Sequence, residues 1–487
     1  MSHSAIISFA VRIDPAVGDS ELTTCRVGCV VTTQTLPTFH ALDERVQESM
    51  QRWSVPGVAV GILLDGHEHT AGFGVTSIEH PLAVDADTLM QIGSITKTFT
   101  ATAAMRLVEA GALTLDQPIR RYLPDLRLSS AEVTAGVSLK HLLTHTAGFV
   151  GDDFSDTGNG DDALARYVVG MAELPQLTPL GETWSYCNSG FCLAGRVIEV
   201  VTGKPYETAL KELVLLPLGM QRAFLFPADV MTHRFAVGHT TPIGEPASVA
   251  RPWPIPRASN AAGGITTSVK DLLRYARFHM GDGTNADGER LLSLEALRTM
   301  HNPLAPADGP DESVGVAWLL RDADGARVVR HAGGTNGQTS TLQLVPERNF
   351  AIAVFTNAGI GGELCREVVR WAMAEYLGLQ DPEPAHLTVP RERLAEYAGA
   401  YDARMASVEV TLTDDGLVVQ PHPKGGFPTK DSPPSPAPPP TRVAFIGDDR
   451  IIALDPPFSR ANGEFLRRPD GTLAWLRWGG RLAARQR

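Results

Sequence analysis

Residues 94–110 read SITKTFTATAAMRLVEA, and this stretch decides how the rest of the chain is interpreted. Its apolar residues follow helical spacing, and Gly111 stands where a glycine commonly ends a helix. Residues three apart share one face of a helix. Ser94 and Lys97 are therefore expected side by side at the first turn, with the serine hydroxyl next to the lysine amine.

This serine–lysine pair has the parts of an acyl-transfer site. A serine hydroxyl is a poor nucleophile at neutral pH and needs a neighbouring base to take its proton. A lysine is charged in water, but burial lowers its pKa far enough for it to act as that base. The free N–H groups at the start of a helix favour an anion formed there. Because the S-x-x-K spacing alone also occurs by chance, it needs support from other segments.

A second polar segment is PLGETWSYCNSGF, residues 179–191. Tyr186 and Asn188 are two apart, and an extended segment would turn both side chains to the same side. A tyrosine can relay a proton, and an asparagine can bind an amine or a substrate amide. The plainer alternative is a buried tyrosine beside a hydrogen-bonded turn asparagine.

A third segment, His331-Ala332-Gly333-Gly334, ends a predicted strand. Glycines let a ligand carbonyl approach the backbone closely, and backbone N–H groups there can supply half of an oxyanion hole. The plainer alternative is a strand-to-loop turn with an incidental histidine.

Strand patterns flank a long helical stretch. A helix is predicted over residues 37–53, followed by a hairpin over Gly57–Val75 that turns at Asp65-Gly66. Residues 98–297 are mostly helices and loops. Strand patterns return later, before a last helix over 365–377; they cover residues 314–320, 327–332, 339–345 and 350–356. These patterns predict an α+β fold, in which both chain ends build an antiparallel sheet flanked by helices, with an all-helical insert between them.

The composition changes after residue 380. We expect an N-terminal extension over residues 1–36, a first domain over 37–380, a linker over 381–391 and a small all-β domain, sandwich or barrel, over 392–487. The last domain is predicted from six short runs, SVEVTL, GLVVQ, RVAFIG, RIIALD, GEFLRR and LAWLRW. The Pro-rich run Pro433–Pro440 cannot join a sheet interior.

Charge and hydropathy exclude several classes. The formal net charge of −12 argues against nucleic acid or an anionic membrane as a partner. No apolar run reaches the roughly 18 residues of a membrane-spanning helix. No signal peptide is evident, so the chain as written is expected in the cytoplasm, and a different start would make it periplasmic or secreted. The five cysteines form no disulfide pattern, and Cys25 and Cys29 lack the second pair of a zinc site.

In this order the three polar segments resemble the signature of the serine β-lactamases and penicillin-binding proteins, which is S-x-x-K, a polar motif and K-T-G. The Y-x-N and H-x-G forms found here resemble its class C-like branch, which includes D-aminopeptidases, DD-peptidases, β-lactamase-fold esterases and mitochondrial β-lactamase-like proteins. The resemblance covers about residues 40–378 and includes four more runs, at 111–118, 122–124, 141–148 and 262–268. The run LAEYAGAYD from Leu394 looks like the lipocalin-like domain attached to several members.

The resemblance implies a role for each site residue. Ser94 is the nucleophile, and Lys97 and Tyr186 share its proton, either of them being the base. Asn188 positions the substrate carbonyl side or Lys97. The N–H groups of Ser94 and Gly334, next to Gly333, form the oxyanion hole.

His331 stands where β-lactamases keep a lysine, so the site has less fixed positive charge for a β-lactam carboxylate. The resemblance then favours a hydrolase that works through an acyl-enzyme, without metal or other cofactor, on small-molecule carboxylic esters or on peptides and amides with small or D-configured residues. The alternatives are a β-lactamase, or a binding or sensing protein that is acylated without turnover. His141 and His145 lack the H-E-x-x-H pattern of a metalloprotease and are expected to be structural.

Overall fold

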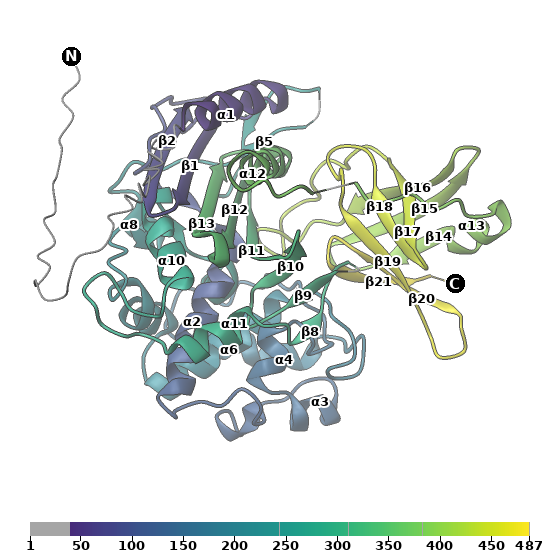
Figure 1. The fold of residues 1–487 in the computed structure, drawn as a ribbon. Coiled ribbons are helices and arrows are strands. Elements are labelled where there is room, and N and C mark those ends of the chain that lie inside the picture. The colour runs from purple at the N-terminus through teal and green to yellow at the C-terminus, as the bar shows by residue number, and fades with distance from the viewer. Residues whose placement is uncertain (1–38, 243, 310, 382, 487) are drawn as a thin grey trace, which may run out of the picture. The chain divides into compact units, whose positions relative to one another are not determined.

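A computed structural model describes residues 39–242, 244–309, 311–381 and 383–486 (Figure 1). The predicted N-terminal extension, with Cys25 and Cys29, lies outside the described residues. Within the described ranges, no helix combines the length and the apolar character needed to cross a bilayer.

The first domain is built on an antiparallel sheet in the order β2-β1-β13-β12-β11-β10-β9-β8. Its first hairpin turns at Asp65 and Gly66, whose φ angles of +48° and +83° suit a two-residue turn. The two ends of this domain therefore meet in one sheet, as predicted. The strands are β1 (Gly57–Leu64), β2 (His67–Gly74), β8 (Ala305–Pro306), β9 (Glu312–Val314), β10 (Leu319–Ala323), β11 (Ala326–Thr335), β12 (Gln338–Val345) and β13 (Phe350–Thr356).

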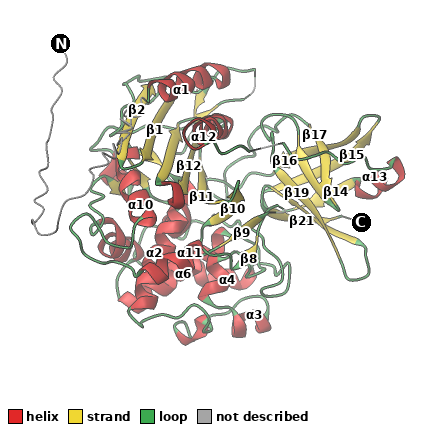
Figure 2. Cartoon of the chain, in the orientation of Figure 1, coloured by secondary structure: helices red, strands yellow, loops and turns green. Residues whose placement is uncertain are grey.

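Helices cover both faces of this sheet (Figure 2). On one face, Val60 of β1 packs with α1 (His40–Trp53) and α12 (Gly361–Leu377) in one apolar cluster. On the other face, Ala59 packs in the cluster of α2 (Thr96–Glu109) and α10 (Val269–Met280). Because both faces are buried, β1 is apolar along its whole length instead of alternating.

Between β2 and β8 the chain forms the predicted helical region, interrupted by short strands. Its remaining helices are α3 (Ala131–Gly136), α4 (Leu139–Leu143), α5 (Ala163–Gly170), α6 (Asn188–Thr202), α7 (Tyr206–Leu210), α8 (Pro227–Val230), α9 (Asn260–Gly263) and α11 (Leu294–His301). Its short strands are β3 (Met90–Gln91), β4 (Ala223–Phe224), β5 (His239–Thr240), β6 (Ser248–Val249) and β7 (Thr266–Thr267).

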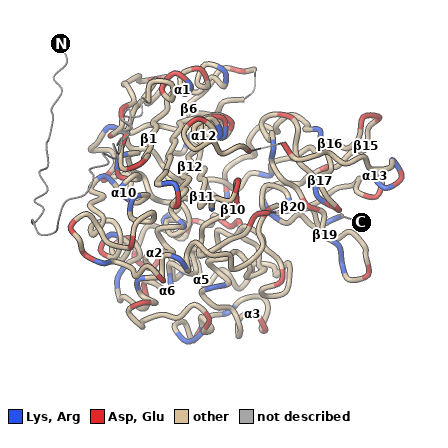
Figure 3. The backbone as a smooth tube through the Cα atoms, in the orientation of Figure 1, with Lys and Arg blue, Asp and Glu red and all other residues tan. Residues whose placement is uncertain are grey.

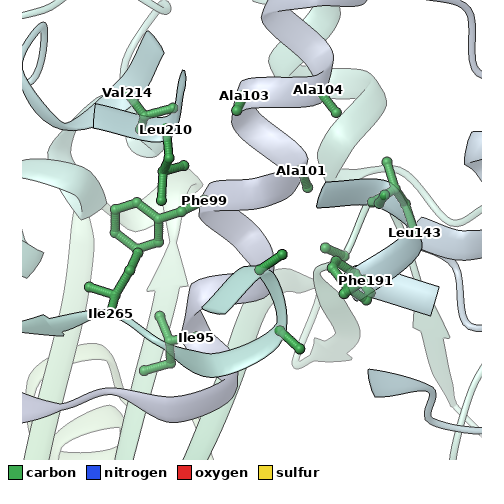
Figure 4. Close-up of a cluster of buried hydrophobic side chains, with 14 of the residues drawn as sticks. Ile95, Phe99, Ala101, Ala103, Ala104, Leu143, Phe191, Leu210, Val214 and Ile265 are labelled. Carbon is green, nitrogen blue, oxygen red and sulfur yellow. The ribbon is translucent and has the colours of Figure 1, made fainter. Parts of the chain in front are cut away.

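Helix α2 runs through the middle of this region and is buried on nearly all sides. Figure 4 shows Phe99 on one side of it, toward Leu210 and Ile265, and the small Ala101 facing the side of Phe191. A helix enclosed in this way is held by packing from every direction. The first turn of α2 is therefore a rigid place for a reactive group.

The C-terminal part is a closed eight-stranded barrel, drawn in light green to yellow in Figure 1. All six predicted runs form strands, and two further strands, β14 and β21, pair with each other and close it. The strands are β14 (Gly399–Asp402), β15 (Ala406–Thr413), β16 (Gly416–Pro423), β17 (Thr441–Gly447), β18 (Arg450–Ala453), β19 (Asn462–Arg467), β20 (Leu473–Trp478) and β21 (Arg481–Arg485). A short helix, α13 (Arg391–Tyr397), precedes them and begins directly after Pro390.

One predicted strand is wrong. The apolar run over residues 314–320 is divided between β9 and β10, because the chain leaves the sheet between them. There Ala317 has a φ of +67° and donates its N–H to Leu143, so this short segment packs against the helical region. The residues are buried, as their hydropathy predicts, but not as a strand.

Charged side chains of both signs are interspersed along the described chain (Figure 3). Many form surface ion pairs, such as Arg251 with Glu79 and Lys270 with Asp87. This distribution agrees with the net charge of −12 and differs from a one-sided basic face.

Candidate active site

Ser94 lies on a single 3₁₀ turn, Gly93–Ile95, that leads into α2. The turn needs glycine at 93, where φ is +49° and where a Cβ would lie 2.6 Å from the backbone nitrogen of Gly334. Lys97 follows in the first turn of α2, and its Nζ is 3.0 Å from Ser94 Oγ. The fold thus brings the two residues together in the expected manner.

Lys97 is fully buried, and its nitrogen has three oxygen atoms around it. It donates to Asn188 Oδ1 at 2.6 Å and to the carbonyl of Ala262 at 2.7 Å, and the third oxygen is Ser94 Oγ. A neutral amine has two hydrogens and one lone pair. When both hydrogens are given to Asn188 and Ala262, the lone pair remains for the hydroxyl proton of Ser94.

The surroundings separate the proton affinities of Lys97 and Tyr186. Burial, assisted by the nearby Arg481 guanidinium, lowers the pKa of Lys97 to about 7. Tyr186 hydrogen-bonds Ser94 as well, and its ring centroid is 4.9 Å from Lys97 Nζ. Burial raises the pKa of this phenol above its ordinary value, although Ser94 and Arg481 act in the opposite direction. Near neutral pH the amine is therefore available as a base, and the phenol keeps its proton.

A buried histidine holds the Tyr186–Asn188 segment. The backbone N–H of Cys187 donates to His145 Nδ1 at 2.9 Å, and the His145 ring stacks on Tyr186 with centroids 4.4 Å apart. Burial lowers the pKa of His145 well below its ordinary value, so the ring is a neutral acceptor. The Cys187 thiol accepts from the N–H of Gly190 and caps α6, which keeps it in a structural role.

His141 has a separate structural contact. Its Nδ1 accepts the backbone N–H of Ser138 at 3.2 Å, in the capping box of α4. The described residues contain no cluster of three or more His, Cys, Asp or Glu side chains placed to hold a metal ion.

His331 lies on β11 with only 2% of its surface exposed. Its Nδ1 is 2.6 Å from the carbonyl of Ala332 and therefore carries the proton, while Nε2 has no hydrogen-bond partner among the described residues. Burial lowers the pKa of His331 to about 3. The imidazole is neutral, in keeping with the smaller fixed charge expected at this position.

The two glycines after His331 have different surroundings. A Cβ on Gly333 would lie 1.9 Å from the carbonyl oxygen of Ile92, so this glycine lets β11 pack against the turn that carries Ser94. A Cβ on Gly334 would meet nothing within 4 Å. The close approach at Gly333 thus involves the protein's own backbone, and the N–H groups of Ser94 and Gly334 lie on adjoining segments beside the open cavity.

Two further residues, which the sequence patterns did not indicate, complete the site. Asn188 Nδ2 donates to Asp152 Oδ1 at 2.6 Å, and Arg481 Nε donates to Asp152 Oδ2 at 3.1 Å. The Arg481 guanidinium also lies over the Tyr186 ring, 4.6 Å from its centroid. A continuous chain of contacts therefore runs from the C-terminal barrel through Asp152 and Asn188 to Lys97.

The barrel backbone also reaches the site. The N–H of Tyr186 donates to the carbonyl of Gly480 at 2.8 Å, and Arg404 pairs with Asp153 at 2.6 Å. These contacts join the β20–β21 turn and the start of the barrel to the segments that carry Tyr186 and Asp152.

Residues 42–369 match the family model described as Beta-lactamase. The chain belongs to this β-lactamase family. Its members include β-lactamases and penicillin-binding proteins, and the family is one of serine hydrolases.

Relatives of this β-lactamase-family chain cover most of its length. Penicillin-binding protein 4 of Amycolatopsis lactamdurans is 34% identical over 375 residues, which are 75% of this chain and 98% of that protein. The unguisins hydrolase ungD of Aspergillus violaceofuscus (strain CBS 115571) is 23% identical over 456 residues, or 87% of this chain and 77% of that one. The crystal structure of SurE with D-Leu has a TM-score of 0.70 and 27% identity, covering 92% of this chain and 99% of SurE. A match of that extent includes the C-terminal barrel.

For this β-lactamase-family site we predict an acid limb in the pH profile. Lys97 takes a proton only when it is neutral, and its pKa is about 7. The kcat/KM should therefore rise about tenfold per pH unit below that value and level off above it. Because the pKa of Tyr186 is raised, no loss of the phenol proton should appear up to pH 9. The measurement is kcat/KM from pH 5 to pH 9, and an acid limb near pH 4 would point to a carboxylate as the base.

Proposed function

We propose that this chain is a metal-independent serine hydrolase that forms an acyl-enzyme at Ser94, on carboxylic esters or on peptides and amides with small or D-configured residues. The observation that carries the proposal is the environment of Lys97. Asn188 and Ala262 take the two hydrogens of a neutral amine, which leaves its lone pair 3.0 Å from Ser94 Oγ.

Acylation uses these groups in sequence. Lys97 accepts the hydroxyl proton as Ser94 Oγ attacks the substrate carbonyl carbon, and the carbonyl π electrons move to oxygen. The N–H groups of Ser94 and Gly334 stabilise that oxyanion. When the intermediate collapses, Tyr186 donates its proton to the leaving group and regains one from Lys97. The net transfer carries the serine proton to the leaving group.

Deacylation reverses the proton path. Lys97, neutral again, takes a proton from a water molecule as its oxygen attacks the ester carbonyl. The second tetrahedral intermediate then releases the acid, and Ser94 Oγ recovers its proton. The chain ends in its starting protonation state.

The neutral His331 supports esters, peptides or amides over β-lactams. A β-lactam carries a carboxylate, and at this strand position the chain offers an uncharged imidazole where β-lactamases keep a lysine. The names of two relatives agree with a peptide-like substrate, since one is an unguisins hydrolase and SurE was crystallised with D-Leu.

We assign the reaction to the domain over residues 37–380, and a role in shaping the site to the domain over 392–487, joined by residues 381–391. Arg481, which lies between Asp152 and Tyr186, supports this assignment.

A substrate panel tests the proposed function. A short-chain p-nitrophenyl ester, a D-alanine amide and a chromogenic cephalosporin are compared by kcat/KM under one condition. We expect the ester or the amide to exceed the cephalosporin by roughly tenfold or more. If the cephalosporin is turned over fastest, the chain is a β-lactamase. If none is turned over and an acyl group stays on Ser94, it is an acylated binding protein.

A further inference from the structure

Ser94 lies between two cavities of opposite character. The first, of about 440 Å³, is the apolar chamber, whose walls are Phe154, Met405, Val408, Phe427, Trp478 and Ala483. The second, of about 700 Å³, is the polar chamber, which contains Tyr186, His331, Arg321, Arg330 and Asp308. Ser94, Gly334 and Arg481 border both chambers.

Most of the apolar chamber's wall comes from the barrel. Val408, Trp478 and Ala483 are buried barrel residues, and Phe427 lies on the loop after β16. The wall is anchored to the first domain, because Phe427 packs edge-to-face on Phe154 with centroids 4.9 Å apart. The chamber thus has apolar surface on both sides and a fixed width.

The polar chamber differs in its unpaired hydrogen-bonding atoms. Trp184 Nε1 and His331 Nε2 both belong to side chains that border it, are more than nine-tenths buried and have no partner in the described structure. A donor and an acceptor left in this way suit a ligand with polar groups of its own.

The two chambers can be assigned to the two halves of the substrate. The proton donor has to reach the leaving group, and Tyr186 borders only the polar chamber. Asn188 and Ala262 border only the apolar chamber. The leaving group is therefore placed on the polar side of Ser94, and the acyl group on the apolar side.

We infer that the chain selects substrates with a bulky apolar acyl group, an aliphatic or aromatic side chain or a medium-length acyl chain, which the barrel-walled apolar chamber receives. This inference rests on the proposed acyl-enzyme at Ser94 and narrows its substrate class. A methyl side chain would leave most of a 440 Å³ cavity empty. Each additional methylene buried there should raise kcat/KM roughly fourfold until the chamber is filled.

Esters with one leaving group and different acyl chains test this inference. The series is p-nitrophenyl acetate, butyrate, hexanoate and phenylacetate, so that only the acyl side varies. For the wild-type chain we expect kcat/KM for hexanoate and phenylacetate to exceed acetate by about tenfold or more.

Three variants separate the chamber from general effects on the barrel. Ala406→Phe adds a ring at a residue bordering the apolar chamber and should bring the hexanoate-to-acetate ratio close to one, with acetate little changed. Thr411→Phe, an exposed residue of the same strand, is the matched control and should keep the wild-type ratio. Phe427→Ala widens the chamber and should move the preference toward longer chains; it also serves if Ala406→Phe does not fold.

The outcomes distinguish the inference from the proposed function. Ester turnover without dependence on chain length, or an equal change of all esters in Ala406→Phe, overturns the chamber assignment alone. A wild-type chain that turns over no ester and carries no acyl group on Ser94 overturns the proposed function, and the inference with it.

Discussion

Ser94→Ala should abolish turnover of every substrate that the wild-type chain hydrolyses. The substitution removes the only oxygen that lies beside Lys97 Nζ and hydrogen-bonds Tyr186, so no covalent ester can form there. Loss of the nucleophile in a serine hydrolase lowers kcat by a factor on the order of 10⁴–10⁶. The measurement is kcat/KM for the fastest substrate of the panel.

The loss should occur in a folded protein. Alanine removes one oxygen atom, and Lys97 keeps its contacts with Asn188 and Ala262. The thermal unfolding midpoint should therefore stay within a few degrees of the wild-type value. The matched control is Ser248→Ala, at an exposed residue of β6, which should keep wild-type activity. If Ser94→Ala retained more than a tenth of the activity, the nucleophile would have to be another residue.

Lys97→Met should lower kcat/KM by a factor on the order of 10²–10⁴, the usual contribution of a general base. Methionine has a similar length and fills the buried space, but it cannot take the Ser94 proton. The acid limb near pH 7 should disappear from the remaining activity, because the group that titrates there is gone. The measurements are kcat/KM at pH 8 and the pH profile of the variant.

The pH profile separates a base from a residue that only supports the fold. Lys204→Met is the matched control, since Lys204 lies on the surface and pairs with Glu212; both its activity and its acid limb should be unchanged. If Lys97→Met kept its acid limb and most of its activity, the serine proton would go to another group, and Tyr186 would be the first to test.

The parts of the site that could be predicted from sequence depend on short-range geometry. Ser94 and Lys97 meet because they are three residues apart at a helix start, and the hairpin at Asp65-Gly66 follows from its turn residues. Tyr186 and Asn188 reach the site through longer-range packing, and their order along the chain indicated it only by resemblance to a family signature.

Asp152 and Arg481 could not be predicted in this way. Asp152 lies in a loop without a regular pattern, and Arg481 begins a barrel strand far along the chain. They meet only because the barrel packs on the loop, and an arginine in a short strand has the same local pattern whether or not it reaches a distant carboxylate. The preference between Lys97 and Tyr186 as base had the same origin, since it depends on burial and on Arg481.

The errors in the fold have physical reasons as well. Over residues 314–320 hydropathy indicated burial correctly, but the backbone bends at Ala317 to reach the helices. The closing strands β14 and β21 are four and five residues long and contain few β-branched residues, so their pairing across the barrel was not indicated locally.

The central claim is that Ser94 carries the acyl group during turnover. The most direct measurement is the intact mass of the wild-type chain, acid-quenched while it hydrolyses its best ester, followed by peptide mapping. We predict an added mass equal to the acyl group, located on the peptide that contains Ser94 and absent from Ser94→Ala. An acyl group on another residue, or the same adduct on Ser94→Ala, would contradict the account.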